Sequence, residues 1–141
     1  MGLAITAVFA DSSYIVEGSA MRFVWVGLGG AVGSVIRYSI GLLPSKSPFP
    51  WATLAINVSG SFILGLFLTW ALGRLPLTVI TPISVGVLGG FTTFSTFAWD
   101  GLFLTRSGRT GFALIYLVLS VVGGIFAAWV GYRLGHGMSS R

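Results

Sequence analysis

Long apolar runs separated by short polar connections dominate the pattern of this chain. Each run reaches the about 20 residues that a helix needs to cross a bilayer. The connections carry proline, serine, glycine and basic residues, which are typical of loops outside the lipid. The pattern predicts an all-α membrane protein with four transmembrane helices in one compact unit. The predicted spans are residues 23–43, 51–73, 79–105 and 110–135.

The segment before the first run does not fit this pattern. Residues 1–20 contain an apolar stretch too short to span a membrane, and they lack the basic start of a signal peptide. Met21 is followed at once by a basic residue and the first span. We expect residues 1–20 to be a poorly ordered N-terminal extension, and residues 21–141 to form the four-helix domain.

Composition supports a chain that lies almost entirely in the bilayer. Of the 141 residues, 55% are hydrophobic and 8% are charged, whereas soluble domains carry about 25% charged residues. Eight Lys and Arg outnumber three Asp and Glu, but the basic residues are scattered singly. A nucleic-acid-binding face would cluster them, so we expect no nucleic-acid partner. The absence of cysteine from the sequence excludes disulfides and thiolate metal sites.

The basic residues are almost evenly divided between the two predicted membrane sides. A fixed topology shows a clear excess of Lys and Arg on the cytoplasmic side. The balance therefore favours insertion in both orientations and an antiparallel homodimer, although with so few charges an uninformative count is the alternative. The two sets are Arg22, Arg74, Arg133 and Arg141 on one side, and Lys46, Arg106 and Arg109 on the other.

The third run departs from a plain membrane helix. Between Gly89 and Asp100 it concentrates two glycines, four hydroxyl side chains and three phenylalanines. Backbone groups freed inside hydrocarbon need partners, so such a segment is tolerated only where it faces protein or lines a watery cavity. We predict that the third helix is broken near residues 89–93, at a permeation or binding site.

Small residues one helical turn apart predict close packing of the helices. Gly29 and Gly33 form such a pair in the first run, and Gly86 and Gly90 form another in the third. Small residues let helix backbones approach closely in lipid. We expect ordinary packing within one subunit to account for most of these pairs.

Polar side chains within the runs are few, and most of them donate hydrogen bonds. Asn57 offers two amide donors, and Tyr116 and Ser120 add hydroxyls one turn apart. Phe94 and Phe97 lie among the hydroxyls of the third run, and their positive ring edges are weakly attractive to an anion. This composition favours an anion over a cation. Alternatively, Asn57 only ties helices together, as polar groups in membranes often do.

Two charged residues lie well inside the runs, away from their last few residues. Arg37, in the second half of the first run, either faces the bundle interior or extends to the membrane interface. Asp100 is the only acid inside a predicted span, and its cost in lipid makes it a functional or structural contact.

Three ordered motifs together resemble the bacterial fluoride channel family (Fluc/CrcB). They are GGAVGSVIRY at residues 29–38, TLAINVSGSF at residues 53–62 and the highly specific GGFTTFSTF at residues 89–97. The resemblance implies a four-helix subunit in an antiparallel dual-topology homodimer, with two pores and a structural sodium ion at the dimer centre. It also implies passive, fluoride-selective export across the bacterial inner membrane.

The resemblance also implies roles for individual residues. Sodium would be held by the backbone carbonyls of Gly89 and Thr92. The family commonly has glutamate where this chain has Asp100, which is shorter by one methylene. The residues that would line the fluoride path are Asn57, Phe94, Ser95, Thr96, Phe97, Tyr116, Ser120 and Arg37.

Two other classes of membrane protein fit less well. A small dual-topology multidrug transporter needs a carboxylate in its first span for proton-coupled export, and residues 23–43 contain none. A membrane enzyme needs positioned titratable groups, and the spans offer one aspartate and no cysteine. We therefore expect a channel and no enzymatic activity.

Overall fold

The computed structural model describes residues 19–139, and helices are the only regular secondary structure in this part of the chain. Four stretches are long and apolar enough to cross a membrane, which confirms the four spans predicted from the sequence. Residues 1–18, which hold most of the expected extension, lie outside the described residues. The elements are α2 (Ser19–Gly41), α3 (Trp51–Ala71), α4 (Leu77–Thr81), η2 (Pro82–Leu88), α5 (Gly89–Phe91), α6 (Phe94–Arg106) and α7 (Thr110–Ser139).

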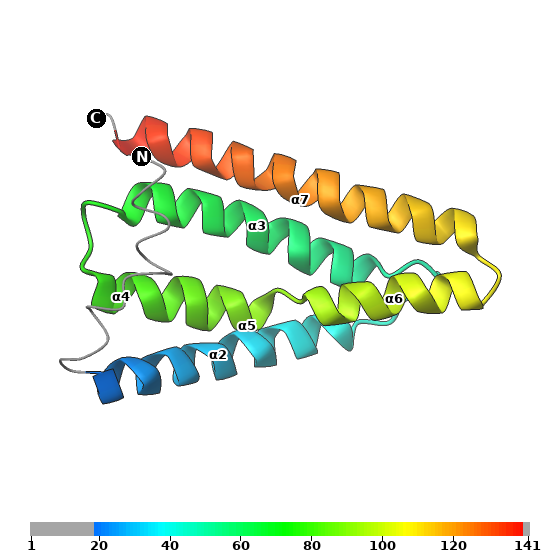
Figure 1. Ribbon diagram of the computed structural model, residues 1–141, viewed down its shortest axis with the longest axis horizontal. Coiled ribbons are helices and arrows are strands. Elements are labelled where there is room, and N and C mark those ends of the chain that lie inside the picture. The colour runs from blue at the N-terminus through cyan, green and yellow to red at the C-terminus, as the bar shows by residue number, and fades with distance from the viewer. Residues whose placement is uncertain (1–18, 140–141) are drawn as a thin grey trace.

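The connections between spans are tight turns whose residues end one helix and start the next. Gly73 follows α3 and Gly108 precedes α7, both with positive φ angles that glycine adopts without strain. Pro76 takes an extended conformation and stands just before α4, where its fixed φ angle suits a helix start. Short turns make successive spans antiparallel, so the spans run back and forth along one axis (Figure 1).

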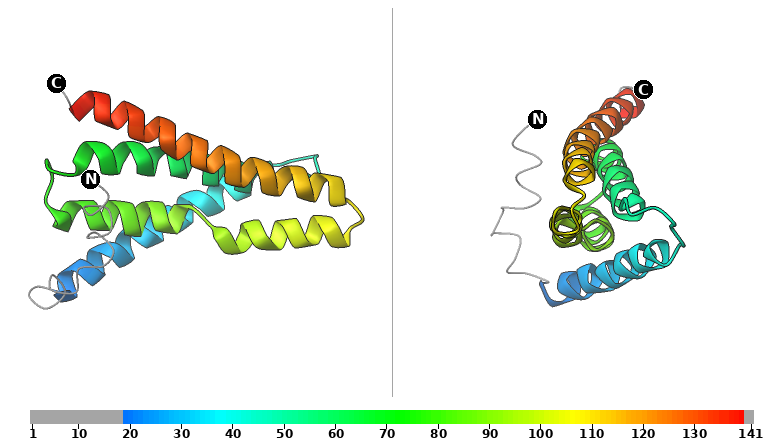
Figure 2. Two further views of the ribbon diagram at one scale, coloured as in Figure 1. Left: turned by 45° about the horizontal axis from the view of Figure 1, so that its top comes forward. Right: turned by 90° about the vertical axis from the view of Figure 1, so that its right-hand side faces the viewer.

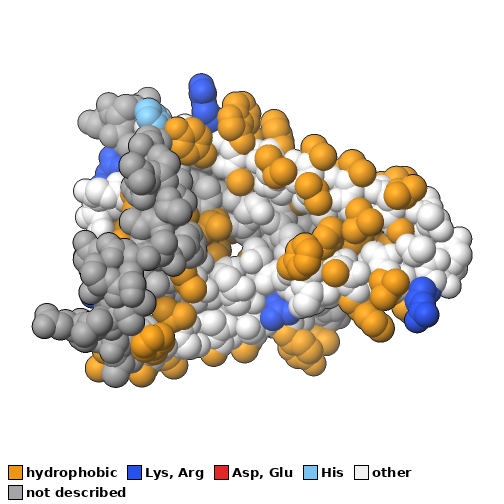
Figure 3. Space-filling view, in the orientation of Figure 1, with side chains coloured by type: hydrophobic (Ala, Val, Ile, Leu, Met, Phe, Trp, Pro, Cys, Tyr) orange, Lys and Arg blue, Asp and Glu red, His pale blue; other side chains and the backbone are white. Residues whose placement is uncertain are grey.

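The spans pack as two pairs. Helix α7 lies along α3, and α2 lies along η2 and α5, whereas α2 and α3 share little contact. The end-on view in Figure 2 shows α2 and α7 on opposite sides, with α3 and the third span between them. The result is an open bundle. Hydrophobic side chains cover much of the face drawn in Figure 3, as expected for a surface in lipid.

Glycines allow α2 to approach the third span backbone to backbone. A Cβ added at Gly33 would collide with the backbone carbonyl oxygen of Val87, and one at Gly90 would lie 2.5 Å from the carbonyl oxygen of Gly30. The close packing predicted from the small residues is therefore confirmed at this interface. This contact fixes the position of the third span against α2 just before residues 92 and 93.

The third span is continuous in direction but not in helical type. Pro82 lacks an N–H and begins η2, a π-helical segment of seven residues. Thr92 and Thr93 then take extended backbone angles between α5 and α6 (Figure 1). Two residues of extended backbone therefore separate Phe91 from the Phe94–Phe97 pair, so the three phenylalanines do not share one helical face.

Candidate functional site

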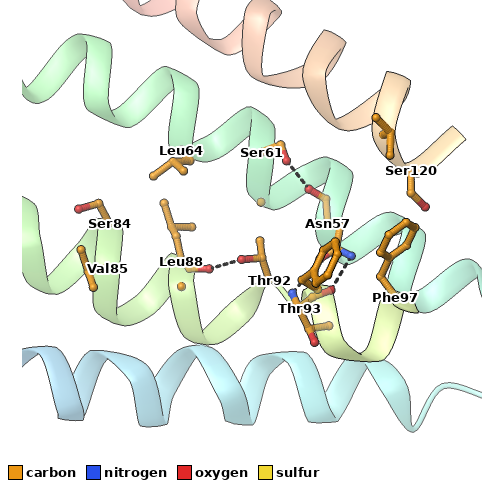
Figure 4. A pocket seen from close by; sticks show the side chains of 14 residues that line it. Asn57, Ser61, Leu64, Ser84, Val85, Leu88, Thr92, Thr93, Phe97 and Ser120 are labelled. Carbon is orange, nitrogen blue, oxygen red and sulfur yellow. Dashed lines mark hydrogen bonds between the residues drawn. The ribbon is translucent and has the colours of Figure 1, made fainter. Parts of the chain in front are cut away.

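A cavity of about 480 Å³ opens between α3, α7 and the third span. It reaches the interruption between α5 and α6 (Figure 4). Its lining is mostly apolar, with amide and hydroxyl groups and no ionisable side chain among the residues that line it. Those residues are Asn57, Gly60, Ser61, Leu64, Ser84, Val85, Leu88, Gly89, Thr92, Thr93, Phe94, Phe97, Ser120 and Val121.

Asn57 binds the interruption through both ends of its amide. Its Nδ2 donates to the carbonyl oxygen of Thr93 at 3.0 Å, and its Oδ1 accepts from the N–H of Thr93 at 2.8 Å (Figure 4). The Oγ of Ser61 donates to the backbone carbonyl oxygen of Asn57, one turn earlier in α3, at 2.7 Å. The amide therefore supplies the donor and the acceptor that a helix would otherwise give to Thr93, and it holds the extended backbone in place.

The contact between Asn57 and Thr93 leaves a backbone carbonyl at the end of α5 without its helical donor. In a continuous helix the N–H of Thr93 would donate to the carbonyl of Gly89, four residues earlier. Here that N–H is bound to Asn57, so the Gly89 carbonyl loses its ordinary donor. Gly89 is exposed and lines the cavity. A carbonyl oxygen released in this way is a suitable ligand for a hard cation.

Thr93 also starts α6. Its hydroxyl oxygen accepts from the N–H of Thr96 at 3.2 Å, which is the arrangement of a helix N-cap. The same hydroxyl lies 3.1 Å from the Thr96 hydroxyl and 3.3 Å from that of Ser95. Ser95 is exposed, and Thr96 is half-buried. The three hydroxyls therefore form one cluster at the N-terminus of α6.

Aromatic rings lead from the cavity to the buried side of α7. The rings of Phe94 and Phe97 lie 5.6 Å apart, and those of Phe97 and Tyr116 lie 5.4 Å apart. Exposure falls steeply along this series, from 79% at Phe94 to 0% at Tyr116. Phe94 thus presents its ring outside the subunit, whereas Tyr116 packs in a core cluster with Phe49 and Leu104.

Asp100 is held by two hydroxyls behind these rings. Thr53 donates through Oγ1 to the Asp100 Oδ2 at 2.8 Å, and the Tyr116 hydroxyl donates weakly to the same oxygen at 3.4 Å. Sequence reasoning singled out Asp100 and Tyr116 but not Thr53. The signal was available, because Thr53 lies four residues before Asn57 and therefore on the same face of α3.

Ser120 differs from the other polar residues of the site. It is 9% exposed and lines the cavity from α7, across from Asn57 (Figure 4). Its Oγ is buried and has no hydrogen-bond partner among residues 19–139. Buried hydroxyls normally have a partner, so Ser120 is an exception among the polar residues of the site.

Arg37 reaches the interruption from α2. Its Nε donates to the carbonyl oxygen of Gly90 at 3.0 Å, so the side chain points into the bundle. This geometry decides between the two positions that the sequence allowed, and excludes extension to the membrane interface. Arg37 also lines a second, smaller cavity of about 220 Å³ together with Thr53, Thr93 and Thr96.

The residues that the resemblance assigned to an ion path therefore fall into four places. The larger cavity brings together Asn57, Phe94, Phe97 and Ser120 with Gly89 and Thr92. The smaller cavity holds Arg37 and Thr96. Ser95 lies on the surface and Tyr116 in the core, and neither lines these two cavities. Thr93 lines both cavities, which makes the interruption the wall between them.

The oxygens at the interruption fit a sodium ion better than a transition metal. Within residues 19–139, no group of three His, Cys, Asp or Glu side chains lies close enough together to hold a metal ion. Backbone carbonyls are ligands for hard monovalent cations, and unwound membrane segments use them in this way. Gly89 and Thr92 both line the larger cavity, so the chemistry of the available donors fits sodium.

Most of the chain is similar in sequence to one family of known proteins. Residues 24–132 match the family described as CrcB-like protein, Camphor Resistance (CrcB). A fluoride-specific ion channel FluC of Thermus thermophilus is 47% identical over 118 residues, covering 81% of this chain and 94% of its own length. FluC 1 of Brucella melitensis is 41% identical over 80% of this chain and 98% of its own. FluC of Acidobacterium capsulatum is 37% identical over 82% and 97%.

Proposed function

The chain belongs to the CrcB-like protein family, and we propose that it is a fluoride-selective ion channel. It is a multi-pass membrane protein. The observation that carries the proposal is the larger cavity at the interruption, which is lined by donors and aromatic rings and has no carboxylate among its lining residues. Relatives that are 37–47% identical over most of both chains are named as fluoride-specific channels.

The lining suits a small anion that must shed water. A fluoride ion needs several short hydrogen bonds in place of its hydration shell. The Asn57 amide has a second N–H beside the one given to Thr93, and Ser120 has an unused hydroxyl. Ring edges of Phe94 and Phe97 add weak positive potential. Donors set for fluoride exclude chloride, because the larger ion does not fit the same spacing.

Flux through this channel is passive. The first membrane-spanning helix, α2, carries no carboxylate that could couple transport to protons. Electrical and concentration gradients therefore drive the ion, and a bacterial cell with a negative interior loses fluoride through its inner membrane. Residues 21–141 form the channel domain. Arg37, Thr96 and the smaller cavity form one approach to the pore.

The functional unit is an antiparallel homodimer with a structural sodium ion. Two findings support it: the basic residues are balanced between the two membrane sides, and the interruption leaves carbonyls at the open side of the bundle. A second copy placed on this side supplies matching carbonyls of Gly89 and Thr92. A cation between them offsets the cost of unpaired carbonyls in the membrane and attracts anions to the pore region.

Fluoride efflux from reconstituted liposomes tests the proposed function. Liposomes loaded with potassium fluoride, and treated with a potassium ionophore, should release fluoride to a fluoride-selective electrode at a rate that depends on the protein. Liposomes loaded with potassium chloride should release little chloride under the same conditions. Equal efflux of both ions would contradict selectivity, and no efflux of either ion would contradict the channel itself.

Site-directed labelling tests the dual orientation. Lys46→Cys and Arg74→Cys place single thiols in loops at opposite ends of the spans. In cells, a membrane-impermeant maleimide should label about half of each variant, because half of the subunits face each way. Complete labelling of one variant and none of the other would refute an antiparallel dimer while leaving the channel function standing.

A further inference from the structure

We infer that Arg37 is a positioning residue that selects which carbonyl of the interruption is left for a cation. It holds the Gly90 carbonyl toward α2, so that the Gly89 carbonyl is the one that remains. The inference rests on the sodium site of the proposed function and adds to it a residue from another helix, which does not itself touch the ion.

Two consecutive carbonyls lose their ordinary donors at the end of α5. The Gly89 carbonyl loses the N–H of Thr93 to Asn57. The Gly90 carbonyl would ordinarily accept from Phe94, but Phe94 lies beyond the two extended residues and begins α6. A carbonyl without a partner at this depth is costly. Each of the two therefore needs a replacement donor or a ligand.

The two carbonyls meet different surroundings. The Gly90 oxygen accepts from the Arg37 Nε at 3.0 Å and weakly from the Ser34 Oγ at 3.5 Å, both on α2. Gly90 does not line the larger cavity, whereas Gly89 does. One carbonyl is therefore satisfied by a cationic side chain within the subunit, whereas its neighbour belongs to a residue that lines the cavity.

The backbones of α2 and the third span pack closely around the hydrogen bond between Arg37 and Gly90. A Cβ at Gly90 would lie 2.5 Å from the Gly30 carbonyl oxygen, and a Cβ at Gly33 would lie 2.8 Å from the N–H nitrogen of Phe91. The backbones of α2 and the third span are therefore in close contact on both sides of Arg37's partner, Gly90. The guanidinium reaches the third span at this close contact, and there it holds the direction of the Gly90 carbonyl.

Arg37 also keeps the Gly90 oxygen from acting as a ligand of the cation. A guanidinium bound to the Gly90 oxygen prevents that oxygen from serving as an additional cation ligand. If Arg37 is replaced, the Gly90 carbonyl keeps only the weak bond from Ser34. It can then turn toward the cavity, where it adds a competing oxygen in poor geometry. Sodium binding then weakens, because a small ion needs its ligands at fixed positions.

The test measures sodium affinity by one method and the response of each carbonyl to sodium by another. The purified full-length protein is titrated with sodium chloride, and the midpoint is taken from the rise in thermal unfolding temperature. The variants are Arg37→Gln, Arg37→Lys as the conservative replacement, and Arg109→Gln as a control in an exposed loop. Carbonyl ¹³C resonances of Gly89 and Gly90, assigned by selective labelling, are recorded in sodium and in potassium.

In the wild type, exchange of sodium for potassium should shift the Gly89 resonance and leave that of Gly90 unchanged. Arg37→Gln should raise the sodium midpoint by about tenfold, the value expected for loss of one charge-assisted hydrogen bond. Arg37→Lys should recover part of this change, because an ammonium still donates to one carbonyl. Arg109→Gln should leave the midpoint within about twofold of the wild type, since exposed charges contribute little.

Two results would overturn the inference while leaving the sodium proposal standing. One is a Gly90 resonance that responds to sodium in the wild type as strongly as that of Gly89, and this measurement decides the question even if no Arg37 variant folds. The other is a folded Arg37→Gln protein with the wild-type midpoint. A wild type without any sodium response refutes the sodium site itself, and fluoride efflux still tests the channel independently.

Discussion

Gly60→Ala is the substitution that tests most directly whether the interruption controls conduction. Gly60 lies on α3 and lines the larger cavity. A Cβ at this position would collide with the Cγ2 of Thr92 and lie 3.2 Å from the Cδ1 of Phe91. The Thr92 side chain cannot simply turn away without loss, because its hydroxyl donates to the Leu88 carbonyl at 3.0 Å. The added methyl therefore pushes on the interruption itself.

The cost in stability follows from two opposing terms. Overpacking by one methyl costs about 1–3 kcal/mol. Replacement of a helical glycine by alanine returns about 0.5–1 kcal/mol. We expect the free energy of unfolding to fall by about 1–2 kcal/mol, which leaves most of the protein folded. Fluoride flux per folded channel should fall by about tenfold or more, because groups at such a site must be held to within about 0.5 Å.

Gly65→Ala is the matched control on the same helix. A Cβ there would collide with the backbone carbonyl oxygen of Ala128 on α7, away from the interruption. It should therefore cost at least as much stability as Gly60→Ala, since a backbone atom cannot rotate aside. Gly27→Ala is the second control, because nothing lies within 4 Å of its added Cβ. This change should stabilise the helix by about 0.5–1 kcal/mol.

The assay combines thermal unfolding in detergent with fluoride efflux normalised to folded, reconstituted protein. Gly60→Ala should lower both stability and flux per folded channel, whereas Gly65→Ala should lower stability alone. Wild-type flux per folded channel in Gly60→Ala would refute the reasoning, because it would show that strain at Thr92 and Phe91 has no effect on conduction. An equal fall in flux in the two variants would refute it as well, because the effect would then follow stability and not position.

Three further substitutions test separate contacts of the site. Asn57→Asp replaces a donor facing the Thr93 carbonyl with an acceptor, so efflux at neutral pH should be abolished and stability should fall by about 1–3 kcal/mol; full efflux would contradict this role. Phe94→Ile removes an exposed ring and should slow efflux while changing stability by less than about 0.5 kcal/mol; wild-type efflux would argue against the ring. Thr53→Val removes the 2.8 Å bond to Asp100 and should lower the free energy of unfolding by about 1–3 kcal/mol. Thr105→Val, which loses only a bond within its own helix, should cost less in the same unfolding assay.

The sequence alone determined the class of protein and the number of spans. Apolar runs of bilayer length permit only membrane helices, because every backbone group in hydrocarbon must be paired within the segment. The motif at residues 89–97 carries the family resemblance by itself, and the family is confirmed. The pairs Gly29–Gly33 and Gly86–Gly90 also predicted close packing, because small residues let helix backbones approach, and the structure brings the two pairs together.

Only the tertiary structure decided what each polar side chain binds. The sequence allowed Asn57 to be a donor to an ion or a tie between helices, and the structure places both ends of its amide on the Thr93 backbone. The sequence allowed Arg37 to face the bundle interior or the membrane interface. Its hydrogen bond to the Gly90 carbonyl shows that it faces the interior. Thr53 became part of the site only through its contact with Asp100. The physical reason is that these partners are more than 35 residues apart in the chain, so their pairing depends on how the helices pack and not on the period of any one helix.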